Sequence, residues 1–267
     1  MNRIAIIGCG TMGEAILGGL RAVPSAPQVT HVTTRRQPVA DELAARLDVF
    51  AGLDPVAAID ATDLALLCVK PGTARQVLTS PGVSEALAGK LLISICAGVS
   101  IDQLQEWAPA ADIIRAMPNT PCVIREGMTV VSPGEGVSEA QIAVAMGIFS
   151  SVGRCRTLEE KHLDAVTGLS GSGPAFACVI LEALADGGVR MGLPRDVAVE
   201  LAAQTFQGAA RMVLQTGKHP AALKDEVTTP AGCTIAGLLT MEDGRIRSIL
   251  ARTIEEATKT ASGLGKN

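Results

Sequence analysis

The chain is poor in aromatic side chains: Phe, Trp and Tyr make up 2% of its 267 residues, and tyrosine is absent. Without a phenolic hydroxyl it cannot use a mechanism that needs tyrosine as an acid, such as that of the short-chain dehydrogenases. Because 48% of the residues are nonetheless hydrophobic, the cores must be built from Ala, Val, Leu and Ile. Such a composition suits helices and buried parallel strands, which are continuous aliphatic runs.

An excess of positive charge is also missing. The net charge of −4 and the isoelectric point near 5.5 argue against nucleic acid or an anionic membrane as a partner. The seven cysteines are odd in number and show no CxxC spacing, so neither a metal site nor a disulfide framework is expected.

The apolar run at the start of the chain is too short for a signal peptide. The longest apolar stretch, Pro174–Leu181, is too short for a membrane span. We therefore expect a soluble, cytoplasmic protein.

The first half alternates short aliphatic strands with helical patterns, which indicates a doubly wound α/β sheet. After the first strand stands Gly8-Cys9-Gly10-Thr11-Met12-Gly13, a G-x-G-x-x-G motif that leads into the helical pattern Glu14–Ala22. In this context the glycines allow a tight turn, the approach of a pyrophosphate and close packing of helix on strand. The alternative is that they serve packing only. The expected strands are Arg3–Ile7, Val29–Thr33, Val49–Phe50, Asp63–Val69, Leu91–Ile95, Ile113–Ala116, Gly127–Ser132 and Gly153–Thr157.

Two arginines, Arg35 and Arg36, follow the second strand, where an NAD-specific site would place Asp or Glu. Guanidinium groups bind a 2′-phosphate through charge-assisted, bidentate bonds. The pattern therefore favours NADPH as the cofactor, with NADH still possible. The alternative is a solvated cationic loop before the helix that starts near Pro38.

The carboxyl ends of the fourth and fifth strands carry further candidates, since an open α/β sheet binds its ligand at this edge. Lys70 follows the fourth strand and either contacts the cofactor or is solvated, whereas small residues after the fifth strand leave space for a flat nicotinamide ring. The predicted cofactor-binding residues are Ile7, Gly8, Cys9, Gly10, Thr11, Met12, Gly13, Arg35, Arg36, Val69, Lys70, Pro71, Cys96, Ala97 and Gly98.

From Leu158 onward the sequence predicts helices only, separated by glycine or proline. The chain therefore divides into a dinucleotide-binding domain of residues 1–157 and an all-α domain of residues 158–267. A helix that starts at Pro174, with Ser172 or Gly173 as its cap, is apolar on nearly every face, and such helices are buried. Because the second domain is too small to enclose it, we expect a homodimer formed through this half. The expected helices are Glu159–Thr167, Pro174–Val189, Arg195–Gln215, Pro220–Val227, Thr234–Met241 and Gly244–Ser262.

Within this helical half, the stretch Lys224–Leu238, KDEVTTPAGCTIAGL, contains a tight turn at Pro230–Cys233. The helix after the turn begins with N–H groups that have no intrahelical partner, and these attract a carboxylate or phosphate. The Thr234 hydroxyl can bond a second polar group of the same ligand. The alternative is an ordinary capped turn between two helices.

Two motifs, DEVTTPAGCTIAGL in this stretch and LSGSGPAF at Leu169–Phe176, resemble the signature of the pyrroline-5-carboxylate reductases. VKP at Val69 and MPNTP at Met117 also match, and the resemblance covers essentially the whole chain. It implies a Rossmann-like domain followed by a helical domain for dimerisation and substrate binding. It also implies NADPH-dependent reduction of 1-pyrroline-5-carboxylate to L-proline, the final step of proline biosynthesis, by a homodimer that in some members assembles further.

The resemblance implies roles for individual residues as well. The backbone around Gly232, Cys233 and Thr234 would hold the substrate carboxylate, and the Thr234 hydroxyl would bond the ring nitrogen as the catalytic group. Glu160 would lie near the same end of the ring, although it could instead be a first-turn helix residue favoured by the dipole. Ser170 and Ser172 either shape the pocket or, the preferred interpretation, cap the long helix. The three histidines, which fall in no motif, are assigned to surface or packing: His31, His162 and His219.

Two other functions fit parts of the pattern. A reductase of the β-hydroxyacid dehydrogenase type would place a lysine in G-x-x-x-K-x-x-N on a buried helix, and Lys218, Lys224, Lys259 and Lys266 lack this setting. A non-catalytic NADP-binding protein would keep the glycine motif and lose the Thr234 site.

Overall fold

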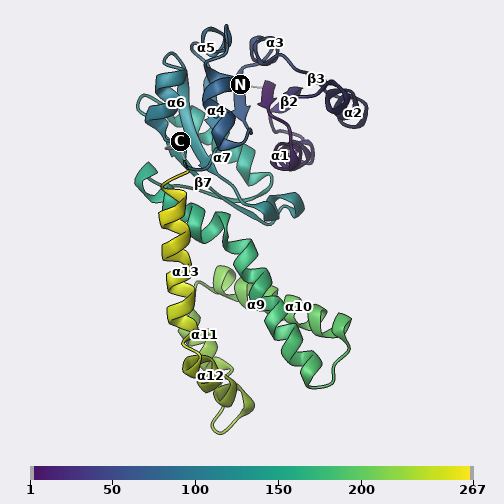
Figure 1. The fold of residues 1–267 in the computed structure, drawn as a ribbon, viewed down its shortest axis with the longest axis vertical. Helices are drawn as coiled ribbons and strands as arrows, with labels where there is room; N and C mark the ends of the chain where they lie inside the picture. Colours follow the sequence, from purple (N-terminus) through teal and green to yellow (C-terminus); the bar gives the residue numbers. More distant parts are fainter. Residues whose placement is uncertain (1–2, 265–267) are drawn as a thin grey trace. The chain divides into compact units, whose positions relative to one another are not determined.

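The computed structural model describes residues 3–264, and the chain forms two compact units (Figure 1). The first contains the residues up to Ser172 together with the segment from Glu255, and the second is Gly173–Ile254. The domain boundary at residues 157 and 158 stays a prediction.

The first unit is built on one eight-stranded sheet with the order β3-β2-β1-β4-β5-β6-β7-β8. Neighbouring strands from β3 to β6 pair in parallel, β7 runs antiparallel to β6, and β8 is parallel to β7. The predicted doubly wound α/β sheet is confirmed. The strands are β1 (Arg3–Ile7), β2 (Gln28–Thr33), β3 (Phe50–Gly52), β4 (Leu64–Leu67), β5 (Leu91–Ser94), β6 (Asp112–Met117), β7 (Gly127–Pro133) and β8 (Gly153–Thr157).

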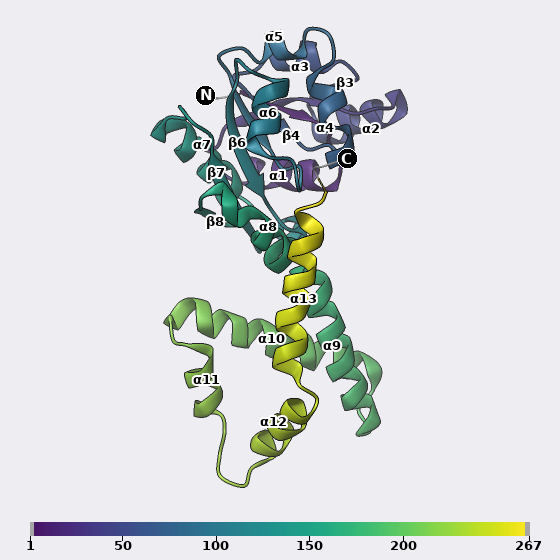
Figure 2. The ribbon, with the colours of Figure 1, turned by 60° about the vertical axis from the view of Figure 1, so that its left-hand side comes forward.

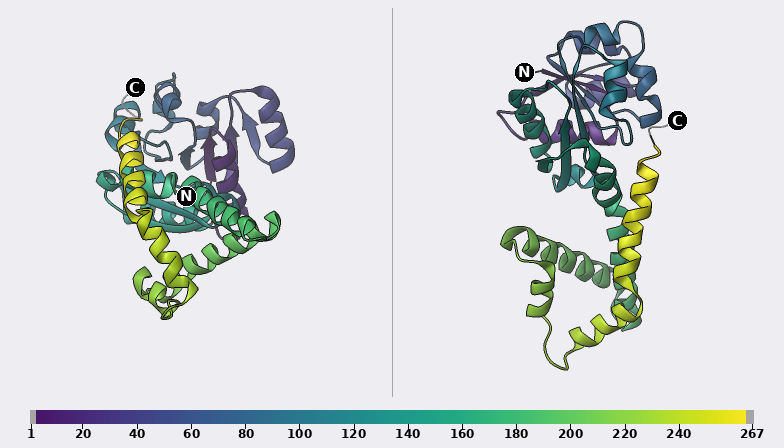
Figure 3. Two further views of the ribbon diagram at one scale, coloured as in Figure 1. Left: turned by 60° about the horizontal axis from the view of Figure 1, so that its bottom comes forward. Right: turned by 90° about the vertical axis from the view of Figure 1, so that its left-hand side faces the viewer.

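Helices cover both faces of this sheet (Figure 3). Because side chains alternate along a strand, Ile4 and Ile6 of β1 join one apolar cluster while Ala5 and Ile7 join the other. The first cluster is completed by α1 (Thr11–Arg21), α2 (Gln37–Leu47) and α7 (Glu139–Ser150), and the second by α3 (Pro55–Asp60), α4 (Pro71–Leu78), α5 (Val83–Ala86) and α6 (Ile101–Trp107).

Two helix starts illustrate how local sequence sets these elements. Ser138 caps α7, and its hydroxyl pairs with Gln141 in a capping box. Ser100 and Gln103 form the same box at α6, a helix that the sequence analysis missed although this pattern could have indicated it. Strand β4 is shorter than the predicted Asp63–Val69, and α4 begins at Pro71 soon after it ends.

The region after β8 winds without a break into the second unit's first helix. It starts with a 3₁₀ turn (Glu160–His162), continues as α8 (Leu163–Val166) and a π turn (Thr167–Gly171), and leads into α9 (Gly173–Arg190). The prediction that Ser172 or Gly173 caps a new helix is wrong, because Ser172 has helical angles and its N–H donates to the Thr167 carbonyl at 2.9 Å. A regular α-helix would bring the Pro174 ring against the carbonyl four residues earlier, and the wider turn avoids this clash.

The second unit is helical throughout (Figure 2): α9 is followed by α10 (Arg195–Thr216), α11 (Pro220–Glu226), α12 (Cys233–Asp243) and the first part of α13 (Ile246–Ala261). Within residues 3–264 no strand follows β8, as predicted. Helices α9 and α10 pack closely, since a Cβ added to Gly188 would lie 3.1 Å from the Ala198 Cβ. Only Ala185 of α9 is buried in the single chain, and Val179 is 65% exposed.

This exposure makes one helix a candidate membrane span by length and composition alone. The continuous helix Glu160–Arg190 contains an 18-residue window of mean hydropathy 1.4, of which 11% is buried. The apolar stretch Pro174–Leu181 is by itself shorter than a membrane span, but the helix also includes the small residues before Pro174.

Candidate functional site

The glycine motif forms a turn that the neighbouring strand holds in place. The Gly8 and Cys9 N–H groups donate to the carbonyl of Thr33, at the end of β2, at 3.1 and 2.8 Å. Gly10 then stands before α1, and no side chain caps this helix N-terminus. The first N–H groups and the dipole of α1 therefore face the carboxyl edge of the sheet, where they can bind a phosphate.

Each glycine of the motif meets a different steric demand. Gly8 has a φ of +87°, and a Cβ there would lie 2.6 Å from Val69 Cγ1, so only glycine fits this turn. A Cβ on Gly10 would meet nothing within 4 Å, so the backbone at this position is open to a ligand. A Cβ on Gly13 would lie 3.0 Å from Ile6 Cγ2, because α1 packs directly on β1. The three glycines thus provide what dinucleotide binding requires: a tight turn, close approach of a pyrophosphate to the backbone, and close packing of helix on strand.

Arg35 and Arg36 lie just beyond the end of β2, next to this turn. Both are exposed, and neither forms an ion pair with any residue of the described part of the chain. The Thr34 N–H donates to the Gly52 carbonyl at 3.0 Å, which fixes the backbone before the arginines to the end of β3. The side chains are thus available to a 2′-phosphate, and no carboxylate stands at the strand end to repel it.

The strand order reverses between β1 and β4, and ligands of open α/β sheets bind at such a point. Val69 follows β4 there, next to Gly8, and the Cys96 thiol donates to the Val69 carbonyl at 3.4 Å. Lys70 is exposed and precedes Pro71, the first residue of α4. The structure therefore brings Gly8, Val69 and Cys96 together at one edge.

Two of the thiols at this edge, Cys9 and Cys96, are not reactive groups. Burial raises the pKa of Cys96 to about 11, and burial together with the Glu14 carboxylate raises the pKa of Cys9 to about 12. Since a raised pKa keeps a thiol protonated at neutral pH, both behave as small apolar residues. The residues present thus fit a dinucleotide phosphate: an uncapped helix N-terminus, an open glycine and two unpaired arginines.

The predicted substrate turn lies in the second unit. The Gly232 N–H donates to the Thr229 carbonyl at 3.1 Å, which closes a tight turn with Pro230 and Ala231 in the middle. Ala231 has a φ of +56°, which is strained for a residue with a Cβ, and a Cβ on Gly232 would overlap the Thr229 hydroxyl. Helix α12 starts one residue earlier than predicted, at Cys233, and no side chain caps it. Thr234 therefore lies in its first turn.

Glu160 lies in the first unit and has partners that the sequence analysis missed. Its Oε1 accepts hydrogen bonds from the Ile101 N–H at 2.7 Å and from Arg115 at 3.0 Å. Arg115 is buried in β6 and also contacts Asp164 at 3.5 Å. A charged residue in the middle of an aliphatic strand signals such a partner, because buried charges must be paired.

Asn119, in the MPNTP loop, is a second residue that the analysis left without a role. Its side-chain oxygen accepts from the Met128 N–H at 2.8 Å, and its amide nitrogen donates to the carbonyl and to the hydroxyl of Ser170, both at 3.2 Å. The Ser170 hydroxyl therefore bonds Asn119 instead of capping the long helix, and this part of the preferred interpretation is wrong.

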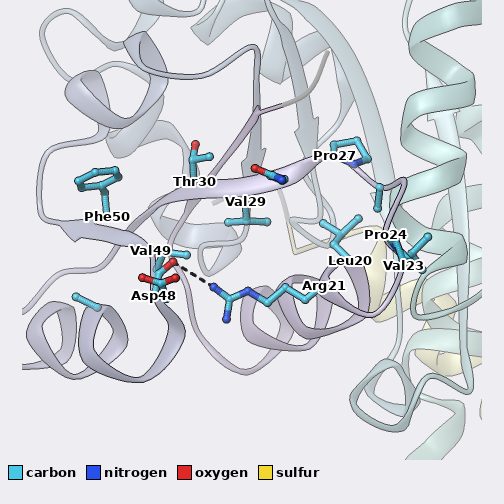
Figure 4. A pocket seen from close by; sticks show the side chains of 13 residues that line it. Leu20, Arg21, Val23, Pro24, Pro27, Val29, Thr30, Asp48, Val49 and Phe50 are labelled. Atoms are coloured by element: carbon cyan, nitrogen blue, oxygen red, sulfur yellow. Dashed lines mark hydrogen bonds between the residues drawn. The ribbon is translucent and has the colours of Figure 1, made fainter.

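Two histidines have structural roles, one in packing and one in capping a helix. His31 stacks on Phe50 with ring centroids 5.0 Å apart, and the His219 Nδ1 accepts from the Ala221 N–H at the start of α11. Phe50 also lines a cavity of about 550 Å³ between the end of α1, the end of α2 and the start of β2 (Figure 4). Arg21 crosses this cavity to the Asp48 carbonyl at 3.3 Å. The cavity lies at the amino end of β2 and contains none of the predicted site residues.

Comparisons with known proteins agree with this arrangement. The family model described as pyrroline-5-carboxylate reductase dimerisation matches residues 160–264, and one described as NADP oxidoreductase, coenzyme F420-dependent, matches residues 3–98. The chain is 45% identical to the pyrroline-5-carboxylate reductase of Schizosaccharomyces pombe, with 100% of both chains covered. The chain belongs to the pyrroline-5-carboxylate reductase family.

Solved structures of the family share the fold. A pyrroline-5-carboxylate reductase from Coxiella burnetii superposes with a TM-score of 0.91 at 32% identity, covering 99% of this chain and 98% of that one. A pyrroline carboxylate reductase from Plasmodium falciparum, solved with NADP bound, gives a TM-score of 0.87 at 28% identity, with 99% and 98% covered. The family, the fold class and NADP as the cofactor are confirmed. The chain is thus an NAD(P)H-dependent oxidoreductase with the family's dimerisation domain in its second half, which supports the predicted homodimer.

Proposed function

We propose that this chain reduces 1-pyrroline-5-carboxylate to L-proline with NADPH, and that Thr234 is the catalytic side chain. The observation that carries this proposal is the turn before α12, which stands intact in a chain that matches the family over its full length. The turn is strained at Ala231 and closed to any side chain at Gly232. Backbone strain of this kind is found at functional sites, where it holds a ligand-binding geometry.

The α12 N-terminus is the proposed site of the substrate carboxylate. The backbone at Gly232, Cys233 and Thr234 offers N–H groups and the positive end of a helix dipole, a combination that favours an anion. The Thr234 hydroxyl then bonds the ring nitrogen. Holding both ends of a small ring fixes the position of its C=N carbon, and positioning is worth up to about 7–11 kcal/mol of the barrier.

The chemistry that remains is simple. Bound NADPH supplies the hydride, which adds to the imine carbon while the nitrogen gains a proton. The chain therefore needs no tyrosine and no His–Asp pair. Glu160 is proposed to lie near the nitrogen end of the ring, where a carboxylate favours the protonated imine, and Arg115 and the Ile101 N–H fix its orientation.

The cofactor residues are proposed to divide the dinucleotide between them. The turn Ile7–Gly13 binds the pyrophosphate, while Arg35 and Arg36 bind the 2′-phosphate. The nicotinamide end lies near two segments, Val69–Pro71 and Cys96–Gly98.

We further propose a cytoplasmic location without membrane insertion, and a homodimer able to assemble into a larger homo-oligomer. The apolar face of α9 would then be covered by protein.

The first test follows the loss of reduced-cofactor absorbance in the presence of pyrroline-5-carboxylate, with NADPH and NADH assayed in parallel. Rapid turnover that favours NADPH is the expected result. Turnover that favours NADH would keep the substrate but remove Arg35 and Arg36 from phosphate binding. If folded dimeric protein binds NADPH but turns over neither cofactor, the non-catalytic alternative is correct.

A further inference from the structure

The long helix is opened at one turn, and a side chain from the loop after β6 replaces the missing bond. Pro174 has no N–H, so the Ser170 carbonyl cannot receive the hydrogen bond that residue i+4 gives in an α-helix. The Asn119 amide donates to this carbonyl instead, at 3.2 Å, and to the Ser170 hydroxyl at the same distance. Asn119 thereby compensates for the proline while the π turn Thr167–Gly171 stays open.

Asn119 is itself held from its other side. Its Oδ1 accepts from the Met128 N–H at 2.8 Å, at the start of β7. The carboxamide thus uses its oxygen on the sheet and its nitrogen on the helix, an orientation that its hydrogen-bond partners fix. Rotation by 180° would place the oxygen against the Ser170 carbonyl and lose these bonds.

The π turn also contacts the end of β6 directly. A Cβ on Gly171 would lie 2.7 Å from the Met117 Cε, so Gly171 packs against the last residue of the strand. Ser94 of β5 pairs with Arg115 of β6. Met117, the last residue of β6, and Cys96, which follows β5, are each two residues further along and therefore lie at the same edge of the sheet. Cys96 is one of the residues predicted to lie near the nicotinamide.

We propose that Asn119 is a positioning residue for hydride transfer: it holds the π turn of the LSGSGP segment against the carboxyl end of β6, where this turn forms a wall of the reaction site. The inference rests on the proposed function for the identity of the reaction. Turns of the π type inside α-helices are frequent at functional sites. Because the open turn is held by one carboxamide, its geometry depends on Asn119 and not on packing alone.

The informative variant is Asn119→Asp, which keeps the acceptor for the Met128 N–H and places a carboxylate oxygen against the Ser170 carbonyl. The matched control is Gln105→Glu. The Gln105 amide donates to two backbone carbonyls, those of Pro109 and Ala111 at 3.0 and 3.2 Å, but it does so before β6 starts, at the opposite end of the strand. Both variants exchange an amide for a carboxylate and remove a bond from a side-chain amide to a backbone carbonyl.

Four measurements distinguish positioning from simple support of the fold. Asn119→Asp should lower kcat about 100-fold, the effect of a misplacement of roughly 1 Å. It should also raise the primary isotope effect with NADPH deuterated at the transferred position, while Kd for NADPH changes less than twofold. In the protein without cofactor, hydrogen exchange of amides 167–173 should accelerate. Gln105→Glu should leave all four quantities near wild type.

A further variant separates the missing bond from the geometry of the turn. Pro174→Ala restores an N–H that can bond the Ser170 carbonyl. In the Asn119→Asp background it should slow hydrogen exchange again without restoring kcat, because an α-helical bond closes the π turn. Wild-type kcat in Asn119→Asp, or recovery of kcat in the double variant, would overturn the inference. Lack of turnover in the wild-type protein would instead refute the proposed function.

Discussion

The turn at Thr229–Cys233 concentrates unusual backbone geometry at single residues. Ala231 has a left-handed φ of +56°, which costs a residue with a Cβ about 1–2 kcal/mol. Replacing it with glycine removes this strain, although glycine gains freedom in the unfolded chain. We expect Ala231→Gly to stabilise the protein by about 0.5–1 kcal/mol, measured by urea unfolding at fixed protein concentration.

A comparison within the same helical unit tests the sign of this effect. Ala222→Gly in α11 places the same substitution at a helical position, where it should destabilise by about 0.5–1 kcal/mol. Equal destabilisation by both substitutions would mean that the turn is not strained at Ala231.

The hydroxyl of Thr234 is the side-chain group on which the proposed chemistry depends. Thr234→Ala should cost about 1.5–3 kcal/mol in kcat/KM, the value of a hydrogen bond to a charged group. Steady-state kinetics at saturating NADPH measures this loss. The control is Thr240→Ala in the same helix, whose hydroxyl only donates to the Ala236 carbonyl at 3.2 Å. Near-wild-type efficiency in Thr234→Ala would remove this residue from the mechanism.

Two exposed arginines should decide between the two nicotinamide cofactors. Arg35→Ala combined with Arg36→Ala should weaken NADPH binding about 10- to 100-fold and leave NADH binding unchanged, because only NADPH carries the 2′-phosphate. Fluorescence titration of both cofactors measures the difference. As a control, Arg154→Ala removes an exposed arginine on β8, the edge strand opposite β3. A similar loss in this control would indicate a general charge effect.

At the scale of elements, the Arg115 cluster fastens the start of the long helix to the sheet. Its guanidinium is 7% exposed and contacts Glu160 and Asp164. Arg115→Met would leave both carboxylates without their cation. The expected destabilisation is about 3 kcal/mol, at the lower end for a broken buried pair because both acids are about a third exposed.

Urea unfolding again provides the measurement, with Arg3→Met as the comparison. The Arg3–Asp63 pair joins exposed side chains and should contribute less than about 1 kcal/mol. If the two substitutions lower the free energy of unfolding by the same amount, burial does not strengthen the Arg115 cluster. Arg115 would then not hold Glu160 in place.

At the scale of the whole molecule, the second unit leaves apolar side chains uncovered in the single chain. Val179 of α9 is 65% exposed, and the dimerisation domain of the family includes this helix. Val179→Asp should therefore convert the dimer into a monomer in sedimentation experiments and abolish turnover. Phe50→Asp is the control, since Phe50 is 73% exposed but lies on β3 of the first unit. A Val179→Asp protein that stays dimeric would show that the interface excludes this side of α9.

The sequence by itself determined the parts of this protein that depend on local chemistry. Alternating aliphatic strands and helices gave the sheet, since periodicity and turn residues act over a few neighbours. The glycine motif, the arginines after β2 and the turn before α12 were equally evident, because each is contiguous in the chain. The two motifs of the second half also sufficed to indicate the family.

Only the tertiary structure decided which distant residues meet. Arg115 and Glu160 are 45 positions apart, and Asn119 and Ser170 are 51 apart. No periodicity reports such pairs, and the LSGSGP motif gave no hint that its helix continues through a π turn past Pro174. The reason is physical: a local pattern records the preferences of neighbouring residues, whereas a buried charge or an unpaired carbonyl is satisfied by whichever group the fold brings to it.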